Sequence, residues 1–318
     1  MSAALSIIIV SWNVRDLLRS CLASIASHRD ALPLQVIVVD SASADGTPEM
    51  VAAEYPWVEL VASPENIGFP AGNNLGFKYA SHPYLFLLNP DTEVVGDALT
   101  TLVSFLETNP GIGVVGPQLL NPDGSVQSSR RRFPTLATAF LESTWLEPLA
   151  PRRILNRYHL RDRRDDEQTE VDWLTGAALV TRREVIAQVG GLDPGYFMYS
   201  EELDWCRRVR DAGWRILYLP SAKVIHHAGK SSEQAVTARH VNFQRAKLRY
   251  FRLYHGWLAA TVLRIYLLAS YLSQIALEGA KGIIGHKRSL RWQRVRSYWR
   301  VLRTGLQPAD GRPYEETP

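Results

Sequence analysis

The sequence predicts an α/β fold in which a mostly parallel β-sheet is flanked by helices and followed by a helical C-terminal extension. Over the first 120 residues, short apolar runs alternate with polar stretches of helix length, a rhythm typical of parallel sheets. The first run, LSIIIVS at residues 5–11, is continuous and β-branched, as expected of a strand buried on both faces. From about residue 238 to residue 303 the apolar spacing is helical throughout.

The elements of the sheet domain can be placed in order from these runs. Pro48 suits the first turn of a helix, and apolar residues recur at helical spacing at Leu17, Leu18, Cys21, Leu22 and Ile25. We expect a mobile loop or a small helical excursion over the charge-dense residues 130–172. Strands are expected at 5–11, 35–39, 58–62, 84–88, from 113, within 171–180, at 215–219 and at 222–226, and helices at 15–27, from 48, at 71–80, 97–108, 183–189 and 202–212.

The composition is that of an ordinary globular protein, with 46% hydrophobic and 21% charged residues among 318. The two cysteines, Cys21 and Cys206, form no disulfide framework and match no zinc-binding spacing. The N-terminal residues lack the basic segment and the cleavage pattern of a signal peptide. We therefore expect a reducing, cytoplasmic location.

Charge is distributed unevenly along the chain. Residues 1–240 hold 22 Lys+Arg against 28 Asp+Glu, whereas residues 241–304 hold 13 basic residues and one acidic residue. An acidic body with a basic tail indicates that the tail meets something anionic. We expect a sheet domain at 1–236 and a basic helical extension at 237–318.

The basic extension is also apolar enough to suggest a membrane partner. Residues 257–277 are long enough to cross a bilayer, although Arg264 lies among them. A helical face flanked by arginines follows, made of Trp292, Val295, Trp299 and Leu302. This combination is typical of a helix lying on an anionic membrane, here the inner membrane. The alternatives are a subdomain packed on the core, a homodimer interface and a true span, and no nucleic-acid recognition motif accompanies the basic charge.

Polar clusters follow two of the predicted strands, where α/β sheets bind ligands. Asp40 lies in VVDSASADGT, and a carboxylate there suits either a base or ribose contact or a simple helix cap. The segment ENIGFPAGNNLGF at 65–77 surrounds a helix start with glycines and asparagines, which favours a phosphate or sugar ligand. It matches neither the dinucleotide fingerprint nor the Walker loop, and this counts against dinucleotide and ATP binding.

Acidic residues mark two further positions. Asp91 in LNPDT stands just past a buried strand, where a carboxylate can hold Mg²⁺ or Mn²⁺ against a diphosphate or simply form a turn. Glu201, Glu202 and Asp204 open a helix, where acids also act as caps. Because crowded carboxylates raise one another's pKa, they also suit a general base. His226 is a candidate metal ligand or a structural histidine.

Seven motifs in this order resemble glycosyltransferase family 2, which has the GT-A fold, and within it the bacterial rhamnosyltransferase-type members. The motifs are VSWN, VVDSASADGT, NIGFPAGNNLGF, LNPDT, WLTGAALV, GLDPGYFMYSEELDWCRR and VIHHAGKSS. The resemblance covers residues 4–235 and implies a nucleotide-binding part at about 1–117 and an acceptor-side part at 118–236.

The resemblance also implies roles on the donor side. Asp40 would contact a uracil or thymine base, and Asp91 would be the second acid of the family's D-x-D motif and bind the metal. Asn89 stands where the first acid is expected, and His226 matches a histidine that completes the metal shell in some relatives. The other donor-side residues implied are Ser11, Asn13, Ser41, Asn66, Gly72 and Asn73.

On the acceptor side, Glu202 falls at the position of the catalytic base, which is usually Asp, with Glu201 and Asp204 as alternatives. Trp173, Thr175 and Gly176 are implied near the acceptor. The implied enzyme uses Mn²⁺ or Mg²⁺ to move one sugar, rhamnose or a similar hexose. It moves the sugar with inversion from a dTDP- or UDP-sugar to a hydroxyl of a glycan or lipid-linked acceptor.

Two other functions stay open at this level. A catalytically weakened carbohydrate- or nucleotide-binding relative is one, because Asn89 and Glu202 depart from the commonest pattern. A sugar nucleotidyltransferase is the other, but it would need a glycine-rich basic loop after the first strand, where VSWNVRD stands.

Overall fold

The computed structural model describes residues 4–142, 144–227, 236–285 and 287–314. The chain forms two compact units. The first contains Met1–Phe133, Asn156–Pro194 and Glu201–Ser231, and the second contains Pro134–Leu155, Gly195–Ser200 and Ser232–Pro318. The second unit therefore combines C-terminal residues with two short stretches from the middle of the chain.

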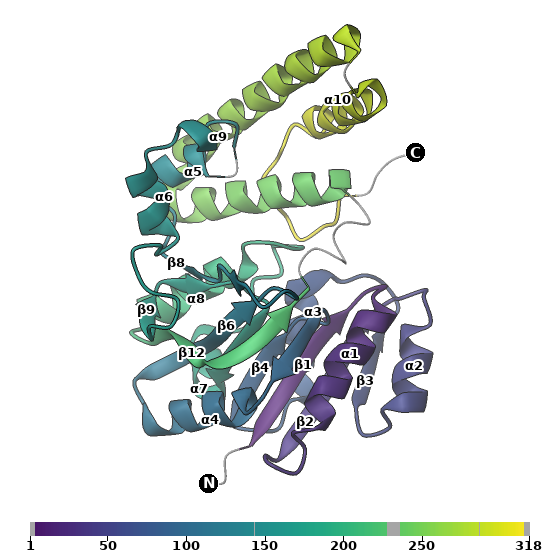
Figure 1. Ribbon diagram of the computed structural model, residues 1–318, viewed down its shortest axis with the longest axis vertical. Coiled ribbons are helices and arrows are strands. Elements are labelled where there is room, and N and C mark those ends of the chain that lie inside the picture. Colours follow the sequence, from purple (N-terminus) through teal and green to yellow (C-terminus); the bar gives the residue numbers. More distant parts are fainter. Residues whose placement is uncertain (1–3, 143, 228–235, 286, 315–318) are drawn as a thin grey trace. The chain divides into compact units, whose positions relative to one another are not determined.

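The first unit is built on a sheet of ten strands within the described residues, in the order β3-β2-β1-β4-β11-β6-β12-β5 with β7 on β6 and β9 on β12 (Figure 1). The strands β1 to β4 and the pair β6–β12 are parallel, whereas β5, β7, β9 and β11 run antiparallel to their neighbours. Strands β8 and β10 form a separate antiparallel pair. The predicted α/β class with a mostly parallel sheet is confirmed. The strands are β1 Leu5–Ser11, β2 Leu34–Ser41, β3 Glu59–Ser63, β4 Tyr84–Leu88, β5 Thr92–Val95, β6 Ile112–Leu120, β7 Val126–Gln127, β8 Arg130–Arg131, β9 Thr169–Val171, β10 Trp173–Leu174, β11 Ala178–Arg182 and β12 Arg215–His226.

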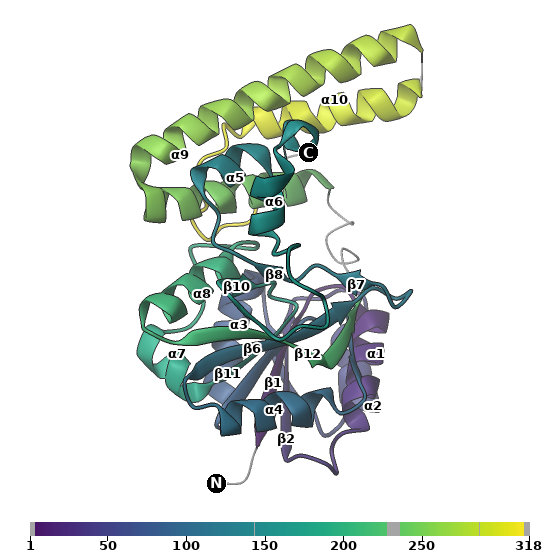
Figure 2. The ribbon, with the colours of Figure 1, turned by 60° about the vertical axis from the view of Figure 1, so that its left-hand side comes forward.

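Helices cover both faces of this sheet, because its strands are apolar on both faces. Ile7 and Ile9 belong to a core with α1, α2 and α4, whereas Ile8 and Val10 on the same strand belong to a core with α3 and α7 (Figures 1 and 2). This alternation is the two-residue period of a strand. The helices of the first unit are α1 Arg15–Ala26, α2 Thr47–Glu54, α3 Gly68–Tyr79, α4 Ala98–Thr108, α7 Arg183–Val189 and α8 Glu201–Asp211.

Two glycines allow α3 to approach β1 closely. A Cβ atom at Gly72 would lie 2.7 Å from Val10, and one at Gly76 would lie 2.4 Å from Ile8. Both distances are far below normal carbon contacts, so any larger residue would push the helix off the sheet. The glycine spacing in this segment therefore has a packing reason.

The middle of the chain is more structured than the predicted loop. Residues 130–172 contain α5 Leu136–Leu141, a 3₁₀ turn at Glu147–Leu149, α6 Arg152–Tyr158 and the strands β8 and β9. Thr135 caps α5 by accepting a hydrogen bond from the backbone of Thr138, which is a local signal for a helix start. The expectation of a mobile loop was wrong here, and the alternative of a small helical excursion is closer to the structure.

The second unit is mainly helical. Its long helix α9 spans Val236–Ile284, but Gly256 has a φ of 86° and divides it into two helices at a sharp bend (Figure 1). The last helix is α10 Arg288–Arg303. Glu278 is buried between α9 and α10 and forms ion pairs with Arg291 at 2.7 Å and Arg294 at 3.5 Å. This pairing lowers the pKa of Glu278 and ties the two helices together.

Segments from the middle of the chain pack against these helices inside the second unit. The rings of Phe140 and Tyr266 meet edge to face, with centroids 5.0 Å apart. The indole N–H of Trp145 donates to the hydroxyl of Ser270 at 3.1 Å. The structure of α9 therefore depends on residues about 125 positions earlier.

Candidate active site

Three polar side chains are buried at the carboxyl ends of β1 and β2. Ser11 lies opposite Asp40 in the parallel register, and Ser41 follows. The Oδ2 atom of Asp40 accepts a hydrogen bond from the Ser43 N–H at 2.9 Å. Asp40 Oδ1 and the hydroxyls of Ser11 and Ser41 have no hydrogen-bond partner in the part of the chain that the structure describes. Since buried polar atoms are normally paired, these atoms are available to a ligand.

Asn13 connects the loop after β1 to the loop after β2. Its N–H donates to the Ser43 hydroxyl at 2.9 Å, and its Oδ1 accepts from the Ala44 N–H at 2.8 Å. The backbone of Asn13 is left-handed, with a φ of 52°, a conformation that asparagine tolerates better than most residues. Asn13 therefore shapes the rim around Asp40.

The asparagine-rich segment before and within α3 makes mostly internal contacts. Asn66 Oδ1 accepts from the Gly68 N–H at 3.1 Å, which closes the turn into the helix. Asn73 is buried and donates to the Phe69 carbonyl at 2.9 Å. Asn74 exchanges two hydrogen bonds with the backbone of Leu192, at 2.7 and 2.9 Å. The described bonds of these residues account for helix geometry and packing, and donor contact by Asn66, Gly72 and Asn73 stays a prediction.

A carboxylate, an amide and an imidazole meet at the turn between β4 and β5. Asp91 is 3% exposed, and its Oδ1 lies 3.4 Å from Nε2 of His226. The antiparallel pairing of β5 and β12 places His226 opposite Thr92, which explains this proximity. Oδ1 of Asn89 and Oδ1 of Asp91 are both buried, and neither has a hydrogen-bond partner among the described residues.

Gln127 on β7 fixes the ring of His226. Its Oε1 accepts from Nδ1 of His226 at 2.7 Å, and its amide nitrogen donates to Asn121 Oδ1 at 3.0 Å. Because the amide oxygen can only accept, Nδ1 donates to it, and Nε2 is the ring nitrogen that faces Asp91. In a neutral imidazole this nitrogen has the lone pair that a metal ligand needs.

The carboxylate of Asp91 and the amide oxygen of Asn89 fit Mn²⁺ or Mg²⁺, which prefer oxygen ligands, and the imidazole of His226 is a common ligand of transition metals. Residues 4–142, 144–227, 236–285 and 287–314 contain no cluster of three or more His, Cys, Asp or Glu side chains that could hold a metal. Asp91 and His226 would therefore supply two ligands, with Asn89, donor phosphate oxygens and water available for the others. Residues 228–232 of the last motif lie outside the described residues.

Replacing Gln127 with leucine is expected to weaken Mn²⁺ binding by about 10–100-fold, because loss of the hydrogen-bond partner of a metal-binding histidine has an effect of that size. Gln127→Glu keeps an acceptor for the Nδ1–H group and should retain most of the affinity. Titration of the protein with Mn²⁺, followed by electron paramagnetic resonance, measures binding without turnover. Gln168→Leu, at an exposed glutamine, is the matched control, and unchanged affinity in Gln127→Leu would contradict the orienting role.

The predicted acceptor-side residues lie in and after β10. The Trp173 indole N–H donates to the Arg132 carbonyl at 2.9 Å, and the Thr175 N–H donates to the Ser129 carbonyl at 2.9 Å. The Thr175 hydroxyl is buried and has no hydrogen-bond partner within the described ranges. These bonds fix the loop that leads to Gly176.

Gly176 and Ala177 connect the two halves of the candidate site. The Gly176 N–H donates to Oε1 of Glu202 at 3.3 Å, and a Cβ at Gly176 would lie 3.4 Å from Glu202. The Ala177 carbonyl accepts from the Asn89 N–H at 2.9 Å. Adjacent residues therefore contact Glu202 on one side and the turn that carries Asp91 on the other.

Two glutamates at the start of α8 have raised pKa values. Burial raises the pKa of Glu201 well above its ordinary value, and the charge of Glu202 raises it further. Burial also raises the pKa of Glu202, although the Gly176 N–H and the Arg131 guanidinium act in the opposite direction. Oε2 of Glu202 is buried, with no hydrogen-bond partner among the residues described. Glu202 therefore combines a raised pKa with an oxygen that can accept a proton.

Asp204 has a different environment from the two glutamates. It is 3% exposed and forms an ion pair with Arg208 at 3.0 Å. Arg208 also donates to the carbonyls of Val189 and Gly191, at 2.6 and 2.8 Å. Asp204 thus neutralises an arginine that fastens α8 to the end of α7.

Several contact residues of the site were missed by sequence reasoning. Arg131 lies in residues 130–172, which we expected to form a mobile loop or a small helical excursion, and Gln127 lies just before them, where we predicted no element. Asn74 was part of a motif, but no pattern indicated its bonds to Leu192. The strands β7 and β8 have two residues each, and strands this short carry no recognisable alternation of polar and apolar residues.

Comparison with known proteins gives information on the family and the fold of this chain. The family model described as Glycosyl transferase family 2 matches residues 6–190. The N-acetylglucosaminyl-diphospho-decaprenol L-rhamnosyltransferase of Mycobacterium tuberculosis (strain ATCC 25618 / H37Rv) is 31% identical over 243 residues, which cover 73% of this chain and 78% of the relative. Rhamnosyltransferase WbbL of Escherichia coli (strain K12) is 30% identical over 169 residues, covering 51% of this chain and 61% of the relative.

Solved structures share the architecture. Mannosyltransferase PcManGT from Pyrobaculum calidifontis, in complex with GDP-Man and Mn²⁺, matches with a TM-score of 0.55 at 18% identity, over 96% of this chain and 87% of that one. GalNAc-T7 with UDP, GalNAc and Mn²⁺ matches with a TM-score of 0.54 at 18% identity, over 71% of this chain and 43% of that one. At such identities the likeness bears on the fold alone, and the predicted GT-A fold is confirmed.

Proposed function

Since the chain belongs to glycosyl transferase family 2, we propose that it transfers one sugar with inversion from a dTDP- or UDP-sugar to a hydroxyl of a lipid-linked glycan precursor. One observation carries the proposal most directly. Residues 176 and 177 contact Glu202 and Asn89 respectively, so a candidate base and a candidate metal-binding turn share one loop. A sugar transferase needs these two elements near each other.

The sugar and the acceptor are proposed from the relatives. The mycobacterial relative is named as an L-rhamnosyltransferase that acts on N-acetylglucosaminyl-diphospho-decaprenol, and the relative from Escherichia coli is also named a rhamnosyltransferase. Rhamnose or a similar hexose is therefore the proposed donor sugar, and a polyprenyl diphosphate sugar is the proposed acceptor.

Asp91 and His226, with Asn89, would hold the divalent metal against the donor. A bound Mn²⁺ or Mg²⁺ would supply neutralising charge for the departing diphosphate. Asp40, with Ser11 and Ser41 beside it, would bind the nucleoside at the ends of β1 and β2, because these side chains offer buried unpaired polar atoms. Gln127 would keep Nε2 of His226 turned towards Asp91.

Glu202 would act as the general base. Its Oε1 is held by the Gly176 N–H, so Oε2 would take the proton from the acceptor hydroxyl. The hydroxyl oxygen then forms its bond to the anomeric carbon as the bond from that carbon to the diphosphate oxygen breaks. One displacement of this kind inverts the configuration, and no second carboxylate is needed as a nucleophile.

A transfer assay tests the proposal. Purified protein is incubated with dTDP-rhamnose or UDP-sugars, an N-acetylglucosaminyl diphosphate lipid, and either Mn²⁺ or EDTA. We expect a glycosylated lipid in the presence of Mn²⁺. Donor binding without transfer or donor hydrolysis would instead support a weakened binding relative, and formation of a sugar nucleotide from a sugar phosphate would support a nucleotidyltransferase.

The second unit has features that suit a membrane surface. Between Thr237 and Ile284, α9 is long and apolar enough to cross a membrane, and only 22% of its most apolar window is buried. The face with Ala260, Leu263 and Leu267 is buried. The exposed apolar residues at helical spacing are Leu258, Val262, Ile265 and Leu272. With the arginines of α10, this exposed stripe supports binding of anionic lipid at the cytoplasmic face of the membrane.

Replacing Leu258, Val262, Ile265 and Leu272 together with serine is expected to reduce binding to anionic liposomes at least tenfold. Each buried aliphatic side chain contributes about 1.5–3 kcal/mol when it leaves water, and all four side chains are exposed in the protein. Co-sedimentation with vesicles of phosphatidylglycerol and phosphatidylethanolamine at low salt measures this. A Leu136→Ser, Leu149→Ser variant removes exposed leucines elsewhere in the same unit and should bind normally, whereas a wild-type protein that stays in the supernatant would contradict the proposal.

A further inference from the structure

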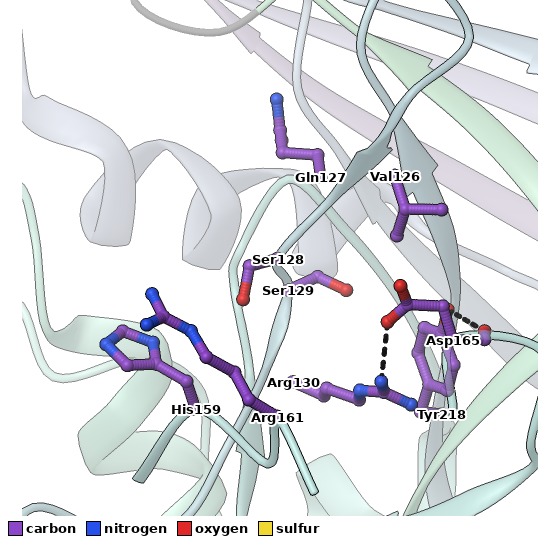
Figure 3. Close-up of a pocket in the computed structure, with 9 residues that line it drawn as sticks. All are labelled: Val126, Gln127, Ser128, Ser129, Arg130, His159, Arg161, Asp165 and Tyr218. Atoms are coloured by element: carbon purple, nitrogen blue, oxygen red, sulfur yellow. Dashed lines mark hydrogen bonds and ion pairs between the residues drawn. The ribbon is translucent and has the colours of Figure 1, made fainter. Parts of the chain in front are cut away.

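A polar cavity of about 160 Å³ lies within the first unit (Figure 3). This volume has room for several water-sized groups, which suits one or two phosphate groups. Gln127, the partner of His226, is among its lining residues, and so is Ser129, whose carbonyl holds Thr175. The cavity therefore adjoins both the candidate metal-binding residues and the acceptor-side loop.

One wall of the cavity is rigid. Arg130 is 5% exposed and forms an ion pair with Asp165 at 2.6 Å, drawn as a dashed line in Figure 3. The same guanidinium donates to the carbonyls of Arg163 and Arg164 and lies over the ring of Tyr218. The only carboxylate in the lining is thus already neutralised by an arginine.

The remaining lining is rich in groups that can donate hydrogen bonds. Ser129 is 3% exposed, and its hydroxyl has no hydrogen-bond partner among the described residues. Nδ1 of His159 is likewise buried without such a partner in the described ranges. Arg161 also lines the cavity, and its guanidinium forms no ion pair with any described residue. A buried hydroxyl and a buried imidazole nitrogen that can both donate, next to the exposed cation of Arg161, are groups that an anionic ligand could contact.

The electrostatics at His159 agree with this. Burial lowers the pKa of His159 to about 4, and the guanidinium groups of Arg131 and Arg161 contribute to the decrease. The imidazole is therefore neutral at pH 7 in a field of positive sign. An anion in the cavity would offset that field.

We propose that this cavity binds the diphosphate group of the acceptor through Ser129, His159 and Arg161. The proposal rests on the proposed function, in which the acceptor is a lipid-linked sugar diphosphate. The sugar attached to the diphosphate would then lie towards Thr175 and Gly176, where Glu202 can reach its hydroxyl. The donor diphosphate is assigned to the turn with Asp91, so the two diphosphates occupy separate places.

Calorimetry with inorganic pyrophosphate in EDTA tests the cavity without turnover. We expect Arg161→Gln to weaken pyrophosphate binding at least tenfold, as for the loss of a charge-assisted hydrogen bond. Arg163→Gln removes an arginine of the same loop that pairs with Glu167 outside the cavity and should bind as the wild type does. Pyrophosphate should also raise the pKa of His159 in a nuclear magnetic resonance titration. Absence of binding, or equal binding by Arg161→Gln, would overturn the proposal.

Kinetics with two acceptors separate the two possible sources of the diphosphate. With an N-acetylglucosaminyl diphosphate lipid, Arg161→Gln should raise the acceptor KM at least tenfold and leave the donor KM unchanged. With an octyl N-acetylglucosaminide, which lacks the diphosphate, the variant and the wild type should be alike. A raised donor KM would assign the cavity to the donor and overturn the proposal. A protein that transfers sugar to neither acceptor would refute the proposed function. The pyrophosphate titration would still test whether the cavity binds a diphosphate.

Discussion

Glu202→Gln is expected to lower sugar transfer by roughly 10²–10⁴-fold, the usual size of general-base catalysis, while donor affinity stays nearly unchanged. The amide keeps the shape of the side chain, but it cannot take a proton from the acceptor. The assigned donor contacts lie at Asp40 and at the turn with Asp91, which do not depend on this carboxylate. Initial rates of transfer and calorimetric donor affinity, measured on the same variant, check both parts.

The other two acids of α8 provide the comparison. Glu201 holds its proton to a higher pH than an ordinary glutamate, because burial and the neighbouring Glu202 raise its pKa. Glu201→Gln imitates this neutral form and should keep most of the activity. Asp204→Asn breaks the ion pair with Arg208 and should lower stability more than turnover. If Asp204→Asn loses transfer while Glu202→Gln keeps it, the base is misassigned, and if all three remain active, no acid of α8 is the base.

The pH dependence has a definite sign. Burial raises the pKa of Glu202, and a general base acts only when it is ionised. Activity should therefore fall as the pH decreases through this raised pKa. The ordinary pKa of a glutamate is about 4.3, so the loss of activity should begin at a higher pH than it would for an unperturbed glutamate. This loss should be absent from the residual activity of Glu202→Gln.

Asp91→Asn is expected to reduce the affinity for dTDP or UDP in Mn²⁺ to the value that the wild type shows in EDTA. Asp91 is the only carboxylate assigned to the metal, because Asn89 occupies the place of the other acid, and loss of a metal ligand commonly removes most of the metal affinity. Calorimetry of each nucleotide with Mn²⁺ and with EDTA measures the difference.

Asp97→Asn is the control for this experiment. Asp97 is exposed and lies just past β5, and its side chain makes no capping hydrogen bond to α4. The Asp97→Asn variant should bind nucleotide as the wild type does. If the wild-type protein binds dTDP and UDP equally well with Mn²⁺ and with EDTA, the site functions without a metal, and the assignment of Asp91 and His226 fails.

Much of the sheet could be predicted, because its strands are apolar on both faces. The ranges predicted for β1 and β4 agree with the structure, since a run such as LSIIIVS has few other ways to bury its side chains. The short strand β5 was missed, because TEVV is brief and follows a proline turn. The single long strand β12 was predicted as two, because Pro220 and Ser221 interrupt its apolar run and coincide with a register shift.

The bend in α9 illustrates a different limit. A glycine within a helical pattern is usually tolerated, and nothing near Gly256 in the sequence distinguishes a bend from a continuous helix. The part of α9 after the bend is held within the second unit, where Phe140 and Trp145 contact Tyr266 and Ser270. Contacts over such separations leave no periodic trace in the sequence.

In the candidate site, residue types at strand ends could be predicted and their partners could not. Asp40, Asp91 and His226 stand where a strand ends, so their position follows from the pattern. The bond between Gln127 and His226 joins residues 99 positions apart. It depends on the pairing of β7 with β6 and of β6 with β12, which no local signal reports.

The second unit draws its residues from three separated stretches of chain, and this limits how the protein can be recombined. A chimera that exchanged only the residues from 237 onwards would leave Phe140 and Trp145 facing the helices of another protein. The middle stretches therefore have to be exchanged together with residues 237–318 when the second unit is transplanted between relatives. For the same reason, insertions between residues 134 and 155 and substitutions in α9 should co-vary across relatives, because these segments pack in one structural unit although they are far apart in the gene.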